Sequence, residues 1–136
     1  MHRAAGDRAR FVLVYVREAH ALDEWVTPDN TKDGIAVPQP LDPSARCDAA
    51  TQMCTRLDVT MRTVTDTLDD RVSTLYGAWP DRVYVLDEAG VVVHKTAIGP
   101  FGFKTADVRE VLVARWGLEL PPTTYEPPSL RPPPQP

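Results

Sequence analysis

Residues 78–93, AWPDRVYVLDEAGVVV, carry the clearest fold signal in the chain. Residues 83–86 are apolar, residues 87–90 are rich in turn-forming types, and residues 91–93 are three valines. Two apolar runs that are separated by a short turn of this kind predict an antiparallel β-hairpin. A proline, Pro80, stands at the end of an expected helix and just before the first strand of this hairpin.

Strand and helix signals alternate on the N-terminal side of the hairpin. Residues 11–16 (FVLVYV) are a continuous β-branched and aromatic run, which is typical of a strand buried in a parallel sheet. Asp42 and Pro43 predict the start of a helix, because Asp caps helices and proline is accepted at the first helical position. The residues of its expected inner face are spaced three and four apart: Cys47, Ala50, Met53, Cys54 and Leu57.

Three more elements follow along the chain. A short strand is expected at residues 61–65, and Asp66 or Thr67 is expected to cap a second helix. The inner face of that helix is expected to hold Leu68, Val72, Leu75 and Trp79 or Tyr76. Thr105 is expected to cap a last helix that buries Val108, Val111, Leu112 and Trp116 and ends at Gly117.

The order of elements is strand, helix, strand, helix, hairpin, helix, which indicates an α/β fold with a mixed sheet covered by helices. The hairpin and the helix after it resemble the second half of a thioredoxin-like fold. That fold places a cis-proline before this strand, beside the reactive sulfur, so we expect the Trp79–Pro80 bond to be cis.

Composition excludes several classes of protein. The chain has 136 residues, one domain's worth, with 15 Lys and Arg against 19 Asp and Glu, so it has no positive surplus for binding nucleic acid. Its apolar runs are too short to span a membrane, and residues 1–10 are polar with no apolar segment typical of a secretory signal. Two cysteines are too few for a disulfide scaffold or a four-ligand zinc site. We therefore expect a cytoplasmic protein with free thiols and no metal.

Two segments lack regular patterning. Residues 121–136 hold 8 of the 14 prolines, which predicts an extended, disordered tail and leaves open a ligand for an SH3-like groove. Residues 18–41 are polar and longer than ordinary loops, so we expect this segment to be functional, mobile or partly structured.

Three segments in order carry a family resemblance: residues 14–20 (VYVREAH) with Trp25, residues 76–85 (YGAWPDRVYV) and residues 98–103 (IGPFGF). Together they resemble the iodothyronine deiodinase family over residues 11–116, and its bacterial relatives more closely than the vertebrate enzymes. The resemblance implies a thioredoxin-fold selenoenzyme or thiol enzyme that reductively removes iodine from an aromatic ring of thyroid hormones such as thyroxine. Its nucleophile is a selenocysteine or cysteine between the family's first strand and first helix.

The resemblance also implies roles for residues of this chain. Glu18 and His20 match the family's Glu-Ala-His motif beside the nucleophile, so they would handle protons and contact the substrate phenol or the selenol. Without the resemblance, a histidine after a strand is an ordinary solvated loop residue. Trp25, Pro80 and Phe101 would line the substrate side. No cofactor is implied beyond a thiol reductant as co-substrate.

The chain departs from the family in one decisive respect. Residues 11–16 match the family's second strand, so the first strand, the nucleophile loop and the first helix are absent. We therefore interpret residues 1–10 as the end of a missing helix and residues 11–120 as a partial thioredoxin-like domain. The strand that holds Val12, Val14 and Val16 is then expected to have an unpaired edge and an uncovered face. The chain as written should not turn over substrate. A gene model that starts after a selenocysteine UGA codon would explain this, with a truncated remnant as the alternative.

Other departures keep the substrate open. Residues 37–40 contain proline where the vertebrate enzymes carry a second histidine, and Ile98 stands where the vertebrate type 3 enzyme has an arginine tied to hormone binding. The substrate is then a small aromatic halide or, in a peroxiredoxin-like thiol oxidoreductase, a thiol or peroxide. A non-catalytic binding module is the remaining alternative. Vertebrate deiodinases dimerise, so a homodimer also stays open.

The remaining candidate residues have ordinary structural interpretations. Cys47 and Cys54 are seven residues apart on one expected helix, about 10 Å at 1.5 Å per residue, and a disulfide needs less than about 7 Å. They are expected to be small core residues, with Cys54 as a resolving thiol in the alternative. Gly99 to Phe103 is expected to be a turn with a positive φ, and its two Phe to be core or a pocket wall. Four further residues are expected in the core: Met53, Tyr76, Trp79 and Trp116.

Overall fold

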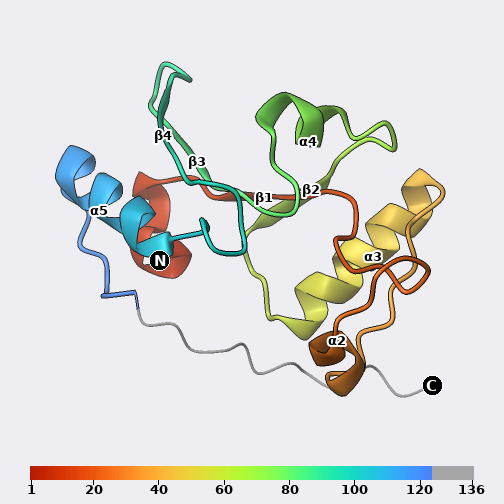
Figure 1. Cartoon of the computed structure of the whole chain (residues 1–136). Helices are drawn as coiled ribbons and strands as arrows, with labels where there is room; N and C mark the ends of the chain where they lie inside the picture. The colour runs from red at the N-terminus through yellow and green to blue at the C-terminus, as the bar shows by residue number, and fades with distance from the viewer. Residues whose placement is uncertain (124–136) are drawn as a thin grey trace. The chain divides into compact units, whose positions relative to one another are not determined.

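The computed structural model describes residues 1–123 (Figure 1). These residues form two compact units, each described here by itself: one holds Val12–Ser73, and the other holds Met1–Phe11 and residues 74–123. The α/β class is confirmed, although the expected mixed sheet is present as two two-stranded sheets, one parallel and one antiparallel. The expected proline-rich tail lies, from residue 124 on, outside the described residues.

The unit formed by Val12–Ser73 is built on a parallel strand pair. Strand β1 (Val12–Tyr15) pairs with β2 (Arg62–Thr65), with Val12 opposite Arg62 and Tyr15 opposite Thr65. The connection between them contains α2 (Pro28–Lys32) and α3 (Pro43–Arg56), and α3 packs against β2. Figure 1 shows this strand–helix–strand order, with α3 as the longest element of the unit.

Helix α3 begins as its sequence predicts. Asp42 is the N-cap, its carboxylate accepts a hydrogen bond from the Ala45 N–H at 2.8 Å, and Pro43 is the first helical residue. The cysteine-bearing face meets β2: the Cys47 Sγ lies 3.7 Å from the Thr65 Oγ1, and the Cys54 thiol donates to the Thr63 Oγ1 at 3.4 Å. The expected inner face is therefore confirmed in direction. Cys47 itself is exposed, however, so the expectation of a core residue is wrong there; the contact shown for its sulfur is with the Thr65 hydroxyl.

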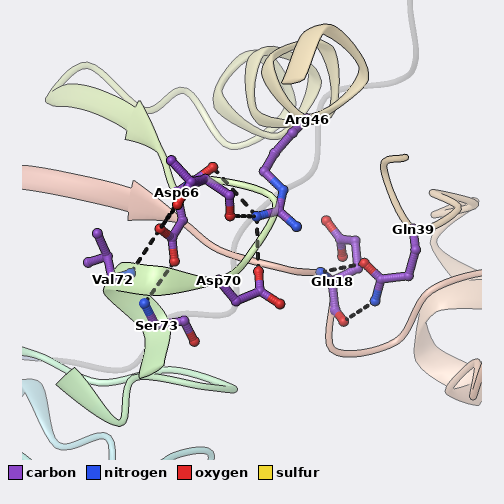
Figure 2. Close-up of polar contacts among 8 residues, drawn as sticks. Glu18, Gln39, Arg46, Asp66, Asp70, Val72 and Ser73 are labelled. Carbon is purple, nitrogen blue, oxygen red and sulfur yellow. Dashed lines mark hydrogen bonds and ion pairs between the residues drawn. The ribbon is translucent and has the colours of Figure 1, made fainter. Parts of the chain in front are cut away.

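Asp66 joins the two strands to the next helix (Figure 2). Its backbone N–H donates to the Tyr15 carbonyl at 2.8 Å, which extends the β1–β2 pairing by one bond. Asp66 is only 5% exposed. Its carboxylate accepts hydrogen bonds from the N–H groups of Thr67, Val72 and Ser73 at 2.8, 3.0 and 2.7 Å. The last two belong to the first turn of α4 (Arg71–Tyr76), so the expected capping role of Asp66 is confirmed.

Arg46 of α3 completes this junction from the other side. Its Nη1 donates to the carbonyls of Asp66 and Thr67, at 3.5 and 2.7 Å, and lies 3.0 Å from an Asp70 carboxylate oxygen (Figure 2). Only 4% of the Arg46 side chain is exposed, so its aliphatic stem is buried while its charge meets a carboxylate and two carbonyls.

The expected inner face of the second helix is wrong. The turn before α4 is held by Asp66 and Arg46, and Asp70 has a φ of 52°, so the helix begins only at Arg71. Leu68 therefore precedes the helix and is 40% exposed. Leu75 is 73% exposed, and Tyr76 and Trp79 are 40% and 42% exposed. These three are therefore not core residues either.

Strand β1 is less buried than its continuous apolar sequence predicts. Val12 and Val14 are 48% and 38% exposed, whereas Tyr15 is buried. Within the described residues, β1 pairs with β2 alone, so the other edge of β1 has no strand partner, and Val12 and Val14 are exposed on one face. This agrees with the uncovered face that we expected for Val12 and Val14; Val16 is half-buried.

The second unit contains the expected hairpin. Strand β3 (Tyr84–Leu86) pairs antiparallel with β4 (Val92–Lys95). The Asp87 carboxylate accepts from the N–H groups of Ala89 and Val91, and Gly90 adopts a φ of 80° that favours glycine. The turn is thus fixed by the residues that predicted it.

Helix α5 (Thr105–Trp116) provides the core of this unit. Its start differs from expectation: the N-cap is Lys104, which makes no side-chain cap, and Thr105 is the first helical residue. Its end is as expected, with Gly117 left-handed and its N–H bonded to Val113. The buried core residues are Ala5, Val85, Val108, Leu112, Leu118 and Leu120, and Trp116 packs against them as expected.

Near the N-terminus, α1 (His2–Ala5) and the short helix η1 (Gly6–Arg8) complete the unit, and Arg8 donates to the Trp116 carbonyl at 2.6 Å.

For the segment around Pro80 and Pro100, the expected cis bond is confirmed, whereas the expected core position of its two Phe is wrong. The Trp79–Pro80 bond is cis as expected, and Gly99–Pro100, which the sequence did not indicate, is also cis. Phe101 and Phe103 are 94% and 40% exposed, so they are not core residues; they lie in an exposed turn before α5.

The two glycines of this turn serve a different purpose from the expected positive φ. Neither Gly99 nor Gly102 has one. Instead a Cβ on Gly99 would overlap the Asp81 carboxylate, and a Cβ on Gly102 would overlap the Ile98 carbonyl. Glycine is needed here because other parts of the chain approach the backbone closely.

Replacing Asp66 by asparagine should destabilise the Val12–Ser73 unit in a pH-dependent way. Burial alone would raise the pKa of Asp66, but hydrogen bonds from Ser73, Val72 and Thr67 outweigh it and lower the pKa below the ordinary value of 3.8. The ionised form of Asp66 therefore adds stability at pH values above the pKa of this carboxyl in the unfolded chain. That stability is lost as the pH falls through the lower pKa of the folded chain. Urea unfolding at pH 7 should show a loss of about 1–3 kcal/mol for D66N.

The exposed Asp48 on α3 offers a matched control with the same change of charge. D48N should lose no more than about 0.5 kcal/mol. Equal losses in D66N and D48N at pH 7 would contradict the junction described here.

Adding a methyl group at Gly99 should destabilise the unit that holds the hairpin. The new Cβ of G99A overlaps the Asp81 carboxylate, so the expected cost is about 1–3 kcal/mol of unfolding free energy. Removing that carboxylate in the double variant D81A/G99A should recover most of the loss relative to D81A. A cost that is the same in both backgrounds would show that the two residues do not meet.

Candidate active site

Glu18 and His20 lie just beyond the carboxyl end of β1, where ligand sites of α/β sheets are found. Strand β1 ends at Tyr15, and both residues are half-buried in the segment that follows. Glu18 and His20 are therefore positioned by the parallel strand pair. Asp66 fixes the C-terminal end of that pair by its bond to Tyr15.

The main chain of Glu18 is held by the side chain of Gln39 (Figure 2). The Glu18 N–H donates to the Gln39 Oε1 at 3.2 Å, and the Gln39 Nε2 donates to the Glu18 carbonyl at 2.7 Å. Burial raises the pKa of the Glu18 carboxyl above its ordinary value of 4.5, and the nearby charge of His20 acts in the opposite direction. A carboxyl in this state is suited to exchanging protons with a neighbouring group.

His20 is packed against Trp25. The two ring centroids are 4.6 Å apart with an interplanar angle of 73°, an edge-to-face arrangement. The His20 Nδ1 is buried and has no hydrogen-bond partner among residues 1–123. Trp25 is 68% exposed, so its indole presents a large free aromatic surface beside the imidazole. The structure thus brings together the three residues Glu18, His20 and Trp25.

The loop that carries these residues is partly structured, which confirms one of the three interpretations of its length. Leu22 donates to the Val37 carbonyl at 2.9 Å, and the Asp23 carboxylate accepts from the Gln39 N–H at 2.9 Å. Helix α2 within it is capped by the Thr27 hydroxyl. The buried Arg56 of α3 donates to the carbonyls of Asp33 and Gly34, at 2.7 and 3.3 Å.

The two cysteines are free, as the helix spacing predicts. Both lie within the continuous helix α3 and face threonines of β2. Cys54 is half-buried and Cys47 exposed. A resolving role for Cys54 stays a prediction.

Pro80 and Phe101, expected on the substrate side, belong to the other unit. Pro80 is half-buried and precedes Asp81, and burial raises the pKa of the Asp81 carboxyl, against a hydrogen bond from Gly99. The Asp81 Oδ1 is buried and makes no hydrogen bond within the described chain. The nearly full exposure of Phe101 leaves its ring free.

Sequence reasoning missed Gln39, which bonds the main chain of Glu18, and Arg46, which completes the junction at Asp66. Gln39 stands between Pro38 and Pro40, and the prolines are the only clear pattern in that stretch. Arg46 looked like an ordinary charged residue on a helix, and the one available signal was its place beside the cysteine-bearing face. Of the acidic residues before α4, Asp66 bonds the first turn of the helix and Asp70 pairs with Arg46. Across residues 1–123, no three His, Cys, Asp or Glu side chains are grouped to hold a metal ion.

No helix within residues 1–123 combines the length and apolar character needed to cross a membrane.

Comparison with known proteins gives a consistent result. The family model described as iodothyronine deiodinase matches residues 5–115. The type I iodothyronine deiodinase of Xenopus laevis is 33% identical over 106 residues, which cover 76% of this chain and 39% of that protein. The thyroxine 5-deiodinase of Aquarana catesbeiana is 35% identical over 106 residues, covering 78% of this chain and 38% of that protein.

The type II iodothyronine deiodinase of Petromyzon marinus is 32% identical over 106 residues, covering 76% of this chain and 35% of that protein. The chain therefore spans well under half the length of these relatives. Since the family model covers most of the chain and agrees with the three motif blocks in its sequence, the chain belongs to the iodothyronine deiodinase family.

Proposed function

We propose that the protein carrying this chain removes iodide reductively from an iodothyronine such as thyroxine, and that Glu18 and His20 move the proton of that reaction. The observation that carries the proposal is the group at the end of β1: a half-buried carboxyl, an imidazole two residues later and an exposed indole packed on it. The names of the relatives supply the substrate class.

The chemistry requires a proton donor. Replacing iodine by hydrogen breaks a carbon–iodine bond and forms a carbon–hydrogen bond, with iodide leaving. The aryl carbon takes one proton and the ring is reduced by two electrons, which two thiols supply as they are oxidised to a disulfide. A His–Glu pair meets the need for the proton, because imidazole can donate near neutral pH and the carboxyl can resupply it.

The aromatic surface of Trp25 suits the other requirement, a contact for an iodinated ring. The substrate contacts expected of Pro80 and Phe101, which belong to the other unit, stay a prediction. In this proposal Cys54 acts as a resolving thiol. Neither Cys47 nor Cys54 attacks the iodine, because both lie on α3 against the threonines of β2. In this proposal the attack belongs to a selenol or thiol other than these two cysteines, and the reductant is an external thiol.

The direct test is iodide release by the whole protein that carries this chain. The DNA upstream of Met1 should be translated through UGA, and the extended product assayed with thyroxine and dithiothreitol. We expect iodide release, with E18Q and H20Q each lowering kcat by about 10²–10⁴-fold. The exposed Asp48 provides the control D48N, which should leave kcat unchanged.

Two results would overturn the proposal. One is the absence of any strand–Sec/Cys–helix segment in frame upstream. The other is an extended protein that consumes peroxide faster than it releases iodide, which would favour the thiol oxidoreductase alternative.

The charge interaction between the two proton-handling residues can be measured on the chain itself. The positive charge of His20 opposes the burial that raises the pKa of Glu18. Removing it in H20Q should therefore raise the pKa of Glu18 further above 4.5, as measured by ¹³C NMR titration of the carboxyl carbon. H2Q, which changes a histidine of the other unit, is the control. An unchanged or lower pKa in H20Q would show that the two side chains do not interact.

A further inference from the structure

The main chain beyond β1 loses its strand partner before it reaches the candidate site. The last bond of the β1–β2 pairing joins the Asp66 N–H to the Tyr15 carbonyl. Glu18 lies three residues later, where β2 has already turned toward α4. Its N–H and carbonyl therefore need other partners, since buried backbone groups are rarely left unpaired.

The Gln39 side chain provides both partners at once. Its Oε1 accepts from the Glu18 N–H at 3.2 Å and its Nε2 donates to the Glu18 carbonyl at 2.7 Å. One residue of a neighbouring antiparallel strand makes the same pair of bonds in a hydrogen-bonded ladder position. The carboxamide thus replaces a strand at the one point where the site needs it. Figure 2 shows both bonds converging on Glu18 from a single side chain.

Gln39 is itself held in place by its neighbours. Pro38 and Pro40 have fixed φ angles, and a residue that precedes proline is restricted to extended conformations. The Gln39 N–H is bonded to the Asp23 carboxylate at 2.9 Å, and Val37 accepts from Leu22 at 2.9 Å. Little conformational entropy is lost when the side chain forms its two bonds, because the backbone is already restricted.

We propose that Gln39 is a positioning residue of this site, which holds the main chain of Glu18 so that its carboxyl stays half-buried next to His20. Gln39 does not touch reacting atoms in this proposal, and it acts only through Glu18. Its effect on catalysis rests on the proposed function. Its effect on Glu18 is independent of any substrate and can be measured without one.

The first test uses Q39M, which keeps the length of the side chain and removes both hydrogen bonds. Hydrogen exchange followed by NMR should show the Glu18 amide exchanging about tenfold faster or more, as the loss of its hydrogen bond would allow. The pKa of Glu18 should fall toward 4.5, because the released loop exposes the carboxyl to water. Q52M makes the same change at an exposed position of α3 and should alter neither value.

A second variant keeps the test decisive if Q39M does not fold. Q39N retains the amide but is one methylene shorter, so it cannot make both bonds to Glu18, and it should shift both readouts in the same direction. Unchanged exchange of the Glu18 amide and an unchanged Glu18 pKa, in whichever variant folds, would overturn the proposal.

Failure of the proposed function would look different. In the extended protein, Q39M should lower kcat with little change in KM, since Gln39 orients a proton-handling residue rather than binding substrate. If Q39M changes the exchange and pKa of Glu18 while E18Q leaves iodide release intact, Gln39 holds Glu18 but Glu18 has no role in that reaction. If neither readout changes in Q39M while E18Q abolishes iodide release, the function stands and the role of Gln39 is refuted.

Discussion

The buried carboxylate of Asp66 is the interaction on which the Val12–Ser73 unit depends. Through its backbone it extends the β1–β2 pairing, and through its side chain it caps α4. Arg46 joins α3 to the same point by bonding the carbonyls of Asp66 and Thr67 and pairing with Asp70. Two strands and two helices therefore meet at one acidic residue. A buried carboxylate is stable there because it accepts four hydrogen bonds, two of them from first-turn N–H groups of α4 that have no acceptor within the helix.

The position of the candidate site follows from this junction. Asp66 fixes the carboxyl end of β1 by its bond to Tyr15, and the chain reaches Glu18 three residues later. From there the loop is organised by polar contacts rather than by an apolar core, with Gln39 bonded to Glu18 and Arg56 bonded to the carbonyls of Asp33 and Gly34. A loop held in this way can place a carboxyl, an imidazole and an indole together while leaving the indole open to a ligand.

The parts of the fold that the sequence predicts are those set by local chemistry. The Asp87–Gly90 turn, the Asp42–Pro43 helix start and the end of α5 at Gly117 each depend on a few adjacent residues, and each is as expected. The exposure of Leu75 and Phe101 could not be predicted, because it depends on which distant elements cover them. The same holds for Arg46, whose partners Asp66, Thr67 and Asp70 lie 20, 21 and 24 residues away in the sequence. Glu18, His20 and Trp25 were found by resemblance, whereas Gln39 was found only from its contacts.

The most direct test of this account is the pKa of Asp66, measured on the chain by ¹³C NMR titration of its carboxyl carbon. The hydrogen bonds from Ser73, Val72 and Thr67 should hold this pKa below the ordinary value of 3.8, despite the burial that acts against them. The amide resonances of Val72 and Ser73 should titrate with the same midpoint, since both N–H groups bond that carboxylate. A pKa at or above 3.8, with no matching change at the two amides, would show that Asp66 does not form the junction on which the rest of this account depends.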